Sequence, residues 1–257
     1  VTGPTGFTGF TGPTGFTGFT GFTGPTGPGL KCDINMNMIA NDDHTTSAPG
    51  SDNTIIGCEG GPINLTTDSS VIIGHNAGQT SVSESVFIGN KAGFTGAGGS
   101  AVAIGSSAGQ LQQGQGSVAV GDRAGNENQS GYSVAVGDRA GQSFQGTQTV
   151  AVGSQAGVST QGNLAVAIGF SSGKEDQRDG GIAIGAFAGL DRQGTGAIGV
   201  GFQSGQLVQG QGALAIGNYA GQSSQGQAAV TIGFESGQFS QEFDSVAIGN
   251  KAAQNSQ

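Results

Sequence analysis

The sequence predicts an all-β protein, a parallel β-solenoid or β-roll of 16-residue coils, preceded by a triple-helical stalk. Two repeats of different period carry this prediction. Glycine occupies every third position near the start of the chain, and from residue 54 a short apolar phrase closed by glycine recurs. Ten successive intervals between the closing glycines are 16 residues long. Such regularity is typical of coils that stack on near-identical neighbours.

Composition narrows the function classes. The 257 residues include 53 glycines and no tryptophan, and only 10% are charged. Large apolar side chains are scarce, so we expect thin layers of small residues rather than a globular core. The net charge of −9 supplies no basic stripe for nucleic acid and opposes binding to an anionic membrane. No run of about 18 apolar residues is present, so we expect no membrane span.

Residues 1–29 predict a collagen-like triple helix. Three polyproline-II chains wind together only where each places glycine at the crowded axis, and the triplets here miss none. A disordered linker rich in Gly, Pro and Thr is the alternative. The chain opens at Val1 within a triplet, so we expect a processed product or part of a longer chain. The predicted axis glycines are Gly3, Gly6, Gly9, Gly12, Gly15, Gly18, Gly21, Gly24 and Gly27.

The triple helix requires three chains, so the stalk predicts a homotrimer. Phenylalanine replaces proline in five triplets, and threonine occupies nearly every third place. Few imino acids mean little preorganisation, so we expect another domain to hold the three chains in register.

Residues 30–53 lose both periods and are predicted to be a junction or trimerisation linker. Apolar side chains alternate from Ile34 to Met38, which favours a short strand or an irregular plug. The pair Asp42 and Asp43 precedes His44, and we interpret this cluster as a solvated loop rather than a cation site.

Cys32 and Cys58 are the only cysteines of the chain. A disulfide between them, within or between chains, would lock the stalk against the solenoid. Two unpaired thiols are the equally supported alternative. Neither cysteine has a histidine at a spacing that suggests catalysis.

Residues 54–257 predict a solenoid head of about 13 coils. With the closing glycine as position 0, positions −3 and −1 carry Val, Ile or Leu, and position −2 is small, usually Ala. In a strand, −3 and −1 share one side. We expect them to fill the coil interior, and the small −2 residue to face another chain. The predicted coil core is Val102, Ile104, Val118, Val120, Val134, Val136, Val150, Val152, Val166 and Ile168.

Recurrent glycines and glutamines predict the two corners of each coil. Glycine at positions 0 and +4 brackets a tight corner that needs positive φ or close backbone approach. Several coils carry Gln-Gly at +8 and +9, which predicts a second corner beyond a polar outer stretch. Equivalent Val, Ile and Gln side chains of stacked coils are expected to form ladders.

The phrase VAIGSSAG at residues 102–109 resembles the head repeats of trimeric autotransporter adhesins. The resemblance covers residues 54–253 and implies a trimer of left-handed parallel β-rolls. The repeat here is longer than that family's typical unit, and nothing resembles its coiled-coil stalk or membrane barrel. A collagen-like stalk bearing a trimeric knob is instead similar to collagen-like surface fibre proteins of large DNA viruses, phages and spores. That similarity implies a location outside the cell or on the surface of a virion, spore or cell.

These features predict a structural, homotrimeric fibre component that mediates attachment. One alternative is an adhesin or a receptor- or glycan-binding module that acts through the variable outer face of the head. An ice-binding surface is a further alternative, but it needs a regular Thr or Ser array that this chain lacks. No nucleophile–base pair, phosphate loop or recurrent calcium-binding Asp is present, so neither an enzyme nor a cofactor or metal is expected. The expected partners are further copies of the chain and a host-surface receptor or glycan.

Overall fold

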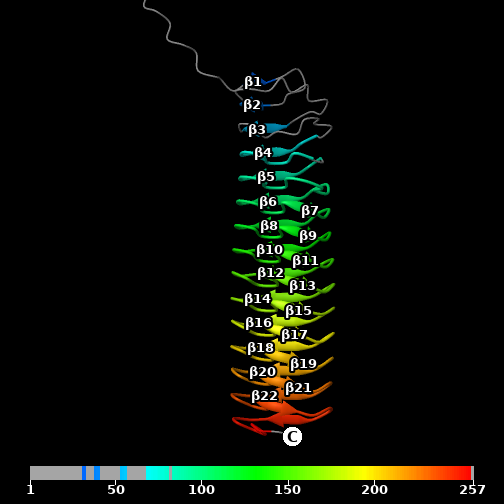
Figure 1. The fold of residues 1–257 in the computed structure, drawn as a ribbon, viewed down its shortest axis with the longest axis vertical. Helices are drawn as coiled ribbons and strands as arrows, with labels where there is room; N and C mark the ends of the chain where they lie inside the picture. Colours follow the sequence, from blue (N-terminus) through cyan, green and yellow to red (C-terminus); the bar gives the residue numbers. More distant parts are fainter. Residues whose placement is uncertain (1–30, 33–37, 41–52, 57–67, 81–82, 256–257) are drawn as a thin grey trace, which may run out of the picture.

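The computed structural model describes residues 31–32, 38–40, 53–56, 68–80 and 83–255. These residues form a parallel β-solenoid of about 11 turns, without a helix, whose coils stack along one long axis (Figure 1). The predicted all-β solenoid is confirmed. In the regular region, paired residues such as Val134 and Val150 lie 16 positions apart, which confirms the predicted length of a coil. The two N-terminal coils of the 13 predicted contain residues outside the described ranges.

The apolar phrases build one sheet, called sheet A here. It contains 15 strands among the described residues, and all neighbours are parallel except β1 and β2. Because β2 pairs with β3, sheet A reaches into the segment predicted as a junction. Its strands, in spatial order, are β1 (Lys31–Cys32), β2 (Met38–Ala40), β3 (Thr54–Ile56), β4 (Val71–Ile73), β5 (Val86–Ile88), β6 (Val102–Ile104), β8 (Val118–Val120), β10 (Val134–Val136), β12 (Val150–Val152), β14 (Val166–Ile168), β16 (Ile182–Ile184), β18 (Ile198–Val200), β20 (Leu214–Ile216), β22 (Val230–Ile232) and β24 (Val246–Ile248).

The polar outer stretch of each regular coil is a second strand, which the sequence analysis did not predict. These strands form sheet B, nine parallel strands within the described part of the chain. Each covers positions +6 to +8 of its coil. They are β7 (Leu111–Gln113), β9 (Glu127–Gln129), β11 (Ser143–Gln145), β13 (Ser159–Gln161), β15 (Glu175–Gln177), β17 (Asp191–Gln193), β19 (Leu207–Gln209), β21 (Ser223–Gln225) and β23 (Phe239–Gln241).

The corner that follows each sheet A strand depends on two glycines. At position 0, φ lies between +125° and +136°, a region open to glycine. A Cβ added to Gly153 would lie 2.6 Å from the carbonyl oxygen of Gly169 in the next coil. At position +4, a Cβ on Gly173 would lie 2.6 Å from Oε1 of Gln177. The predicted tight corner, where the backbone needs positive φ or close approach, is therefore confirmed.

The strands of sheet A direct the opposite set of side chains into the coil interior from the set predicted. Alanine at −2, such as Ala103, is fully buried, whereas Ile104 at −1 is 37% exposed. In the regular coils, sheet A directs only the small −2 residue of each strand into the interior, and the β-branched pair points outward. The prediction is wrong for all ten residues proposed as coil core, which are half-buried or exposed: Val102, Ile104, Val118, Val120, Val134, Val136, Val150, Val152, Val166 and Ile168.

A column of buried glutamines at +8 completes the interior. The predicted glutamine ladder is confirmed, but it lies inside the coils, which the sequence analysis did not expect. The two hydrogens of Gln177 Nε2 are shared among three acceptors, the carbonyl oxygens of Val166 (2.9 Å) and Gly181 (3.0 Å) and Oε1 of Gln193 (2.9 Å). The same bond to the −3 carbonyl of the coil recurs from Gln113 to Gln225 and ties sheet B to the backbone of sheet A, whereas Gln241 donates to Phe239 and Ala253. The column is Gln113, Gln129, Gln145, Gln161, Gln177, Gln193, Gln209, Gln225 and Gln241.

The first coils fill the same interior differently. Position −2 is occupied there by Ile55, Ile72 and Phe87, all buried, and position +8 of the Phe87 coil is Ala97 instead of glutamine. A Cβ on Gly93 would overlap the Phe87 ring. In the Phe87 coil the large interior side chain therefore comes from sheet A, whereas in the regular coils it is the glutamine of sheet B.

Candidate functional site

Titratable side chains do not assemble into a chemical site in the part of the chain that the structure describes. No group of three or more His, Cys, Asp or Glu residues lies close enough together there to hold a metal ion. His75 is exposed, with Nδ1 3.0 Å from Nδ2 of Asn76. Glu175 and Asp176 are exposed on β15. Nor do the described residues include a helix able to cross a membrane.

The outer face of sheet A is an apolar surface. Every sheet A strand from β5 to β24 presents two Val, Ile or Leu side chains outward, at −3 and −1. Neither position carries a polar or charged residue in any of these strands. Parallel pairing in register places Val150 beside Val166 and Val152 beside Ile168, so each position forms a continuous row. Ile184 and Ile216 are each 38% exposed. An apolar area that spans this many strands is typical of an interaction surface.

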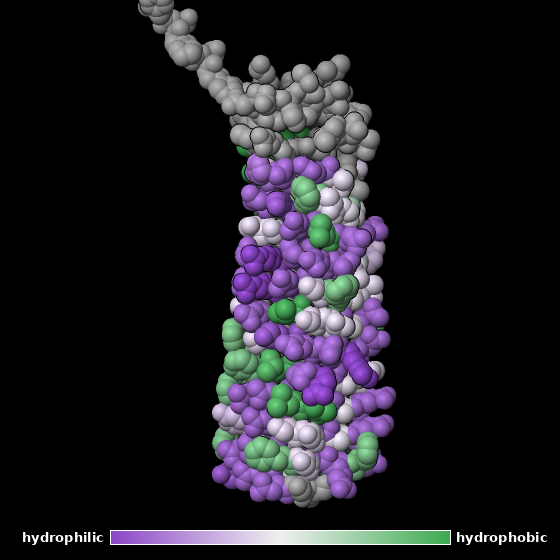
Figure 2. Space-filling view, viewed as in Figure 1, coloured by the Kyte–Doolittle hydropathy of each residue, from purple (hydrophilic) through white to green (hydrophobic). Residues whose placement is uncertain are grey.

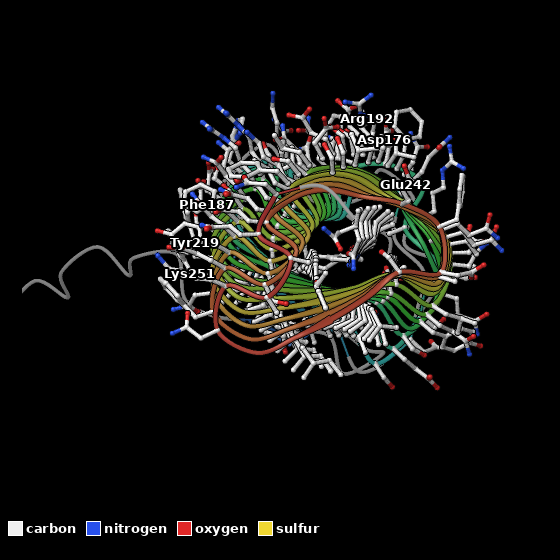
Figure 3. All side chains as sticks on the ribbon, turned by 90° about the horizontal axis from the view of Figure 1, so that it is seen from below. Asp176, Phe187, Arg192, Tyr219, Glu242 and Lys251 are labelled. Atoms are coloured by element: carbon white, nitrogen blue, oxygen red, sulfur yellow. The ribbon has the colours of Figure 1, made fainter. Side chains whose placement is uncertain are left out.

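A row of aromatic rings lies on the corner between the two sheets, at positions +1 and +2. Figure 3 shows Phe187 and Tyr219 on the same side of the solenoid, pointing away from the interior. Successive rings meet edge to face, with centroid separations of 5.2, 6.1, 5.4 and 6.1 Å. The row contains one ring per coil over five coils: Phe170, Phe187, Phe202, Tyr219 and Phe234.

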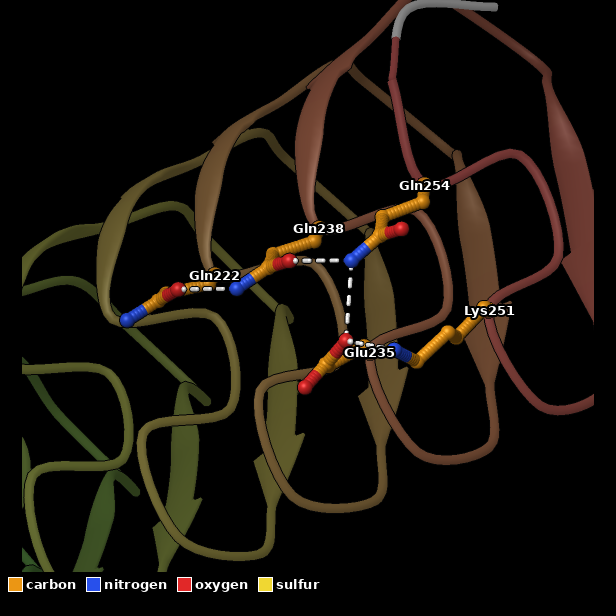
Figure 4. A network of polar contacts seen from close by, with 5 residues as sticks. All are labelled: Gln222, Glu235, Gln238, Lys251 and Gln254. Carbon is orange, nitrogen blue, oxygen red and sulfur yellow. Dashed lines mark hydrogen bonds and ion pairs between the residues drawn. The ribbon is translucent and has the colours of Figure 1, made fainter.

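Amide side chains at +5 form a second row beside the aromatic one. Nε2 of Gln222 donates to Oε1 of Gln206 (3.1 Å), Gln238 donates to Gln222 (2.9 Å), and Gln254 donates to Gln238 (2.9 Å). The row ends where Gln254 also donates to Glu235, which pairs with Lys251 at 3.2 Å (Figure 4).

A shallow hollow lies beyond sheet B, at the second corner. Its volume is about 670 Å³, and its lining includes Asp176, Arg178, Asp179 and Arg192. Charges there are already partnered in part, because Arg192 forms an ion pair with Asp191 at 3.2 Å. The face shown in Figure 2 is largely hydrophilic, with smaller hydrophobic patches among the hydrophilic residues.

Several predicted residues lie outside the described part of the chain. These include all nine axis glycines of the stalk, the cluster of Asp42, Asp43 and His44, and Cys58. Cys32 ends β1, but its pairing with Cys58 stays a prediction. The aromatic row was missed by the sequence analysis, although the alternation of Phe or Tyr between +1 and +2 in consecutive coils is a signal for it.

Comparison with protein-family models, with curated proteins and with solved structures finds no match to the chain.

Proposed function

We propose that this protein is a structural component of a homotrimeric fibre, located outside the cell or on the surface of a virion, spore or cell. In this proposal a collagen-like stalk carries a β-solenoid head, and the head mediates attachment. The observation that carries it is the apolar outer face of sheet A, together with the glycine triplets of residues 1–29.

The sheet A face suits contact with further copies of the same chain. Removal of apolar surface from water contributes about 25 cal/mol per Å², against which the entropic cost of association is set. The rows of Val and Ile are flat, in register and free of charge, although the chain as a whole carries −9. Charge elsewhere keeps such an assembly soluble.

Three chains that leave a triple helix run in the same direction. Their solenoids then start at the same level, so that equivalent coils of the three heads lie side by side. Rotation about a threefold axis places each sheet A face against its neighbours, and the arrangement closes without leaving an open apolar edge. The weak stalk and the apolar head face therefore support the same stoichiometry, and the head supplies most of the stability.

Replacement of a stalk glycine tests whether the head, rather than the stalk, holds the trimer together. Gly15→Val places a side chain at the axis of the triple helix, so the stalk is expected to melt at a lower temperature. The head is expected to remain trimeric, because its contacts do not involve the stalk. Circular dichroism in the polyproline-II region reports the melting, and light scattering reports the molar mass. Thr17→Val adds a similar side chain at an outward triplet position and serves as the control. Dissociation of the whole trimer by Gly15→Val would contradict the proposal that the head organises assembly.

A further inference from the structure

We propose that the aromatic row from Phe170 to Phe234, with the amide side chains beside it, binds a linear, uncharged oligosaccharide. This inference deepens the attachment role proposed above and rests on it. It names the surface and the ligand class, which the variable outer residues alone do not identify.

The fold does not require rings at these positions. Other coils of the same length and backbone carry Ser106, Asp122 and Arg123 at +1 and +2. The backbone of Phe187 has φ +60° and that of Tyr219 φ +61°, in the left-handed region that large side chains seldom adopt. Five consecutive coils nevertheless place a ring at this corner. The rings therefore serve a purpose other than closure of the coil.

The exposed ring surface suits stacking against sugar rings. Phe170, Phe202 and Phe234 are between 37% and 47% exposed. Coils are spaced by roughly 4.8 Å, so the row offers ring faces and edges at regular steps along the solenoid axis. The face of an aromatic ring is electronegative and attracts the weakly positive C–H groups of a pyranose. A linear chain of sugars that lies along the axis meets successive rings.

Beside the later rings, Nε2 of Gln203 and of Gln206 donates to no side chain among the described residues and can bond hydroxyl groups. The coils of Phe170 and Phe187 carry Lys174 and Leu190 at +5 instead of an amide. Nε2 of Gln222 donates to Oε1 of both Gln203 and Gln206, at 3.1 Å each, which connects the +5 row to the +2 position of a ring-bearing stretch. Oδ1 of Asn218 accepts a bond from the backbone N–H of Phe202 at 3.3 Å. A primary amide both donates and accepts, as a sugar hydroxyl does.

Positions +1 and +2 carry no charge in the first four of the five ring-bearing coils. Between residues 170 and 219, the +1 and +2 positions carry Phe, Tyr, Ser, Ala, Gln and Asn. The charged residues of these coils are paired: Lys174, at +5 in the coil of Phe170, lies 3.9 Å from Glu175, and Glu235, at +2 in the coil of Phe234, lies 3.2 Å from Lys251. This pattern favours an uncharged ligand over a charged one.

The platform lies on a corner, whereas the proposed trimer contact uses the outer face of sheet A. One trimer therefore presents three platforms, and simultaneous binding to a surface that carries many copies of a glycan strengthens attachment without new contacts.

Calorimetric titration of the full chain with neutral hexasaccharides tests the inference. The probes are the β-1,4-linked hexamers of glucose and of N-acetylglucosamine and the α-1,6-linked hexamer of mannose. At least one is expected to bind. Phe187→Ser and Tyr219→Gln introduce residues that other coils carry at +2, so both variants are expected to fold. Each is expected to weaken binding by about tenfold.

Tyr132→Gln and Phe144→Ser are the matched controls, because both side chains are exposed aromatic residues outside the row. The controls are expected to bind like the unmodified chain. The inference is overturned if no probe binds at millimolar concentration, or if the controls lose binding as much as the row variants. Molar mass is measured on the same samples. If the chain is a trimer but binds no probe, the glycan inference is wrong and the proposed trimer stands. If the chain is a monomer that binds through the row, the proposed trimer is wrong and the glycan inference stands.

Discussion

Gly153→Ala is expected to destabilise the solenoid by about 4 kcal/mol and to open the coils on both sides of it. Two effects add at this position. The backbone adopts φ +128°, and the new Cβ would lie 2.6 Å from the carbonyl oxygen of Gly169. The obstructing atom belongs to backbone that is itself hydrogen-bonded, since the N–H of Gly169 donates to the carbonyl of Val152 at 2.8 Å. Neither coil can move aside without loss of a bond between coils.

Gly212→Ala is the control for this prediction. Gly212 also has a positive φ, +65°, but an added Cβ would meet nothing within 4 Å. Its expected cost is about 1 kcal/mol, which arises from the backbone conformation alone. Unfolding in guanidinium chloride followed by circular dichroism gives the stabilities, and hydrogen exchange identifies the coils that open. Equal destabilisation by the two variants would show that close packing between coils does not limit the fold.

Ile184→Lys combined with Ile216→Lys is expected to convert the trimer into monomers. Both side chains are 38% exposed in the single chain and project from the outer face of sheet A. In the proposed trimer each lysine would be buried without a partner, and such a charge costs several kcal/mol per site. The circular dichroism spectrum of the head is expected to be unchanged, because neither side chain enters the coil interior.

The control for this variant lies on the opposite sheet. Leu111→Lys combined with Leu207→Lys adds the same charge at side chains that are 38% and 40% exposed on the outer face of sheet B. This variant is expected to remain trimeric. A trimer that survives the sheet A substitutions, or that is lost equally in both variants, would show that sheet A is not the contact face.

The repeat length, the sheet A strands and the glycine corners were predictable because each follows from local sterics. A glycine that recurs every 16 residues beside a β-branched pair leaves few backbone conformations open. The phase of the strand was not predictable in the same way. Alternation shows that Val102 and Ile104 share a side, but not whether that side faces the interior, since Ala103 is apolar as well. Which side faces the interior is decided by the position of sheet B, which the sequence analysis did not predict.

Sheet B itself left no readable signal. Its strands are polar, and their middle residues have left-handed backbones, as at Asp176 (φ +51°) and Arg192 (φ +54°), so the alternation that identifies a strand is interrupted. The aromatic row was hidden for a related reason. Its rings alternate between +1 and +2, so neither column of aligned positions is uniformly aromatic. Only the folded coils bring Phe187 and Phe202 into contact.

The molar mass of the full chain in solution, measured by light scattering, tests the central claim most directly. The method assumes no compact shape, which suits a rod. A mass three times that of one chain is the expected result, and it would support both the stalk and the sheet A contact. A mass equal to one chain would contradict the account, because the apolar face of sheet A would then be exposed to water and the triplets would not form a triple helix.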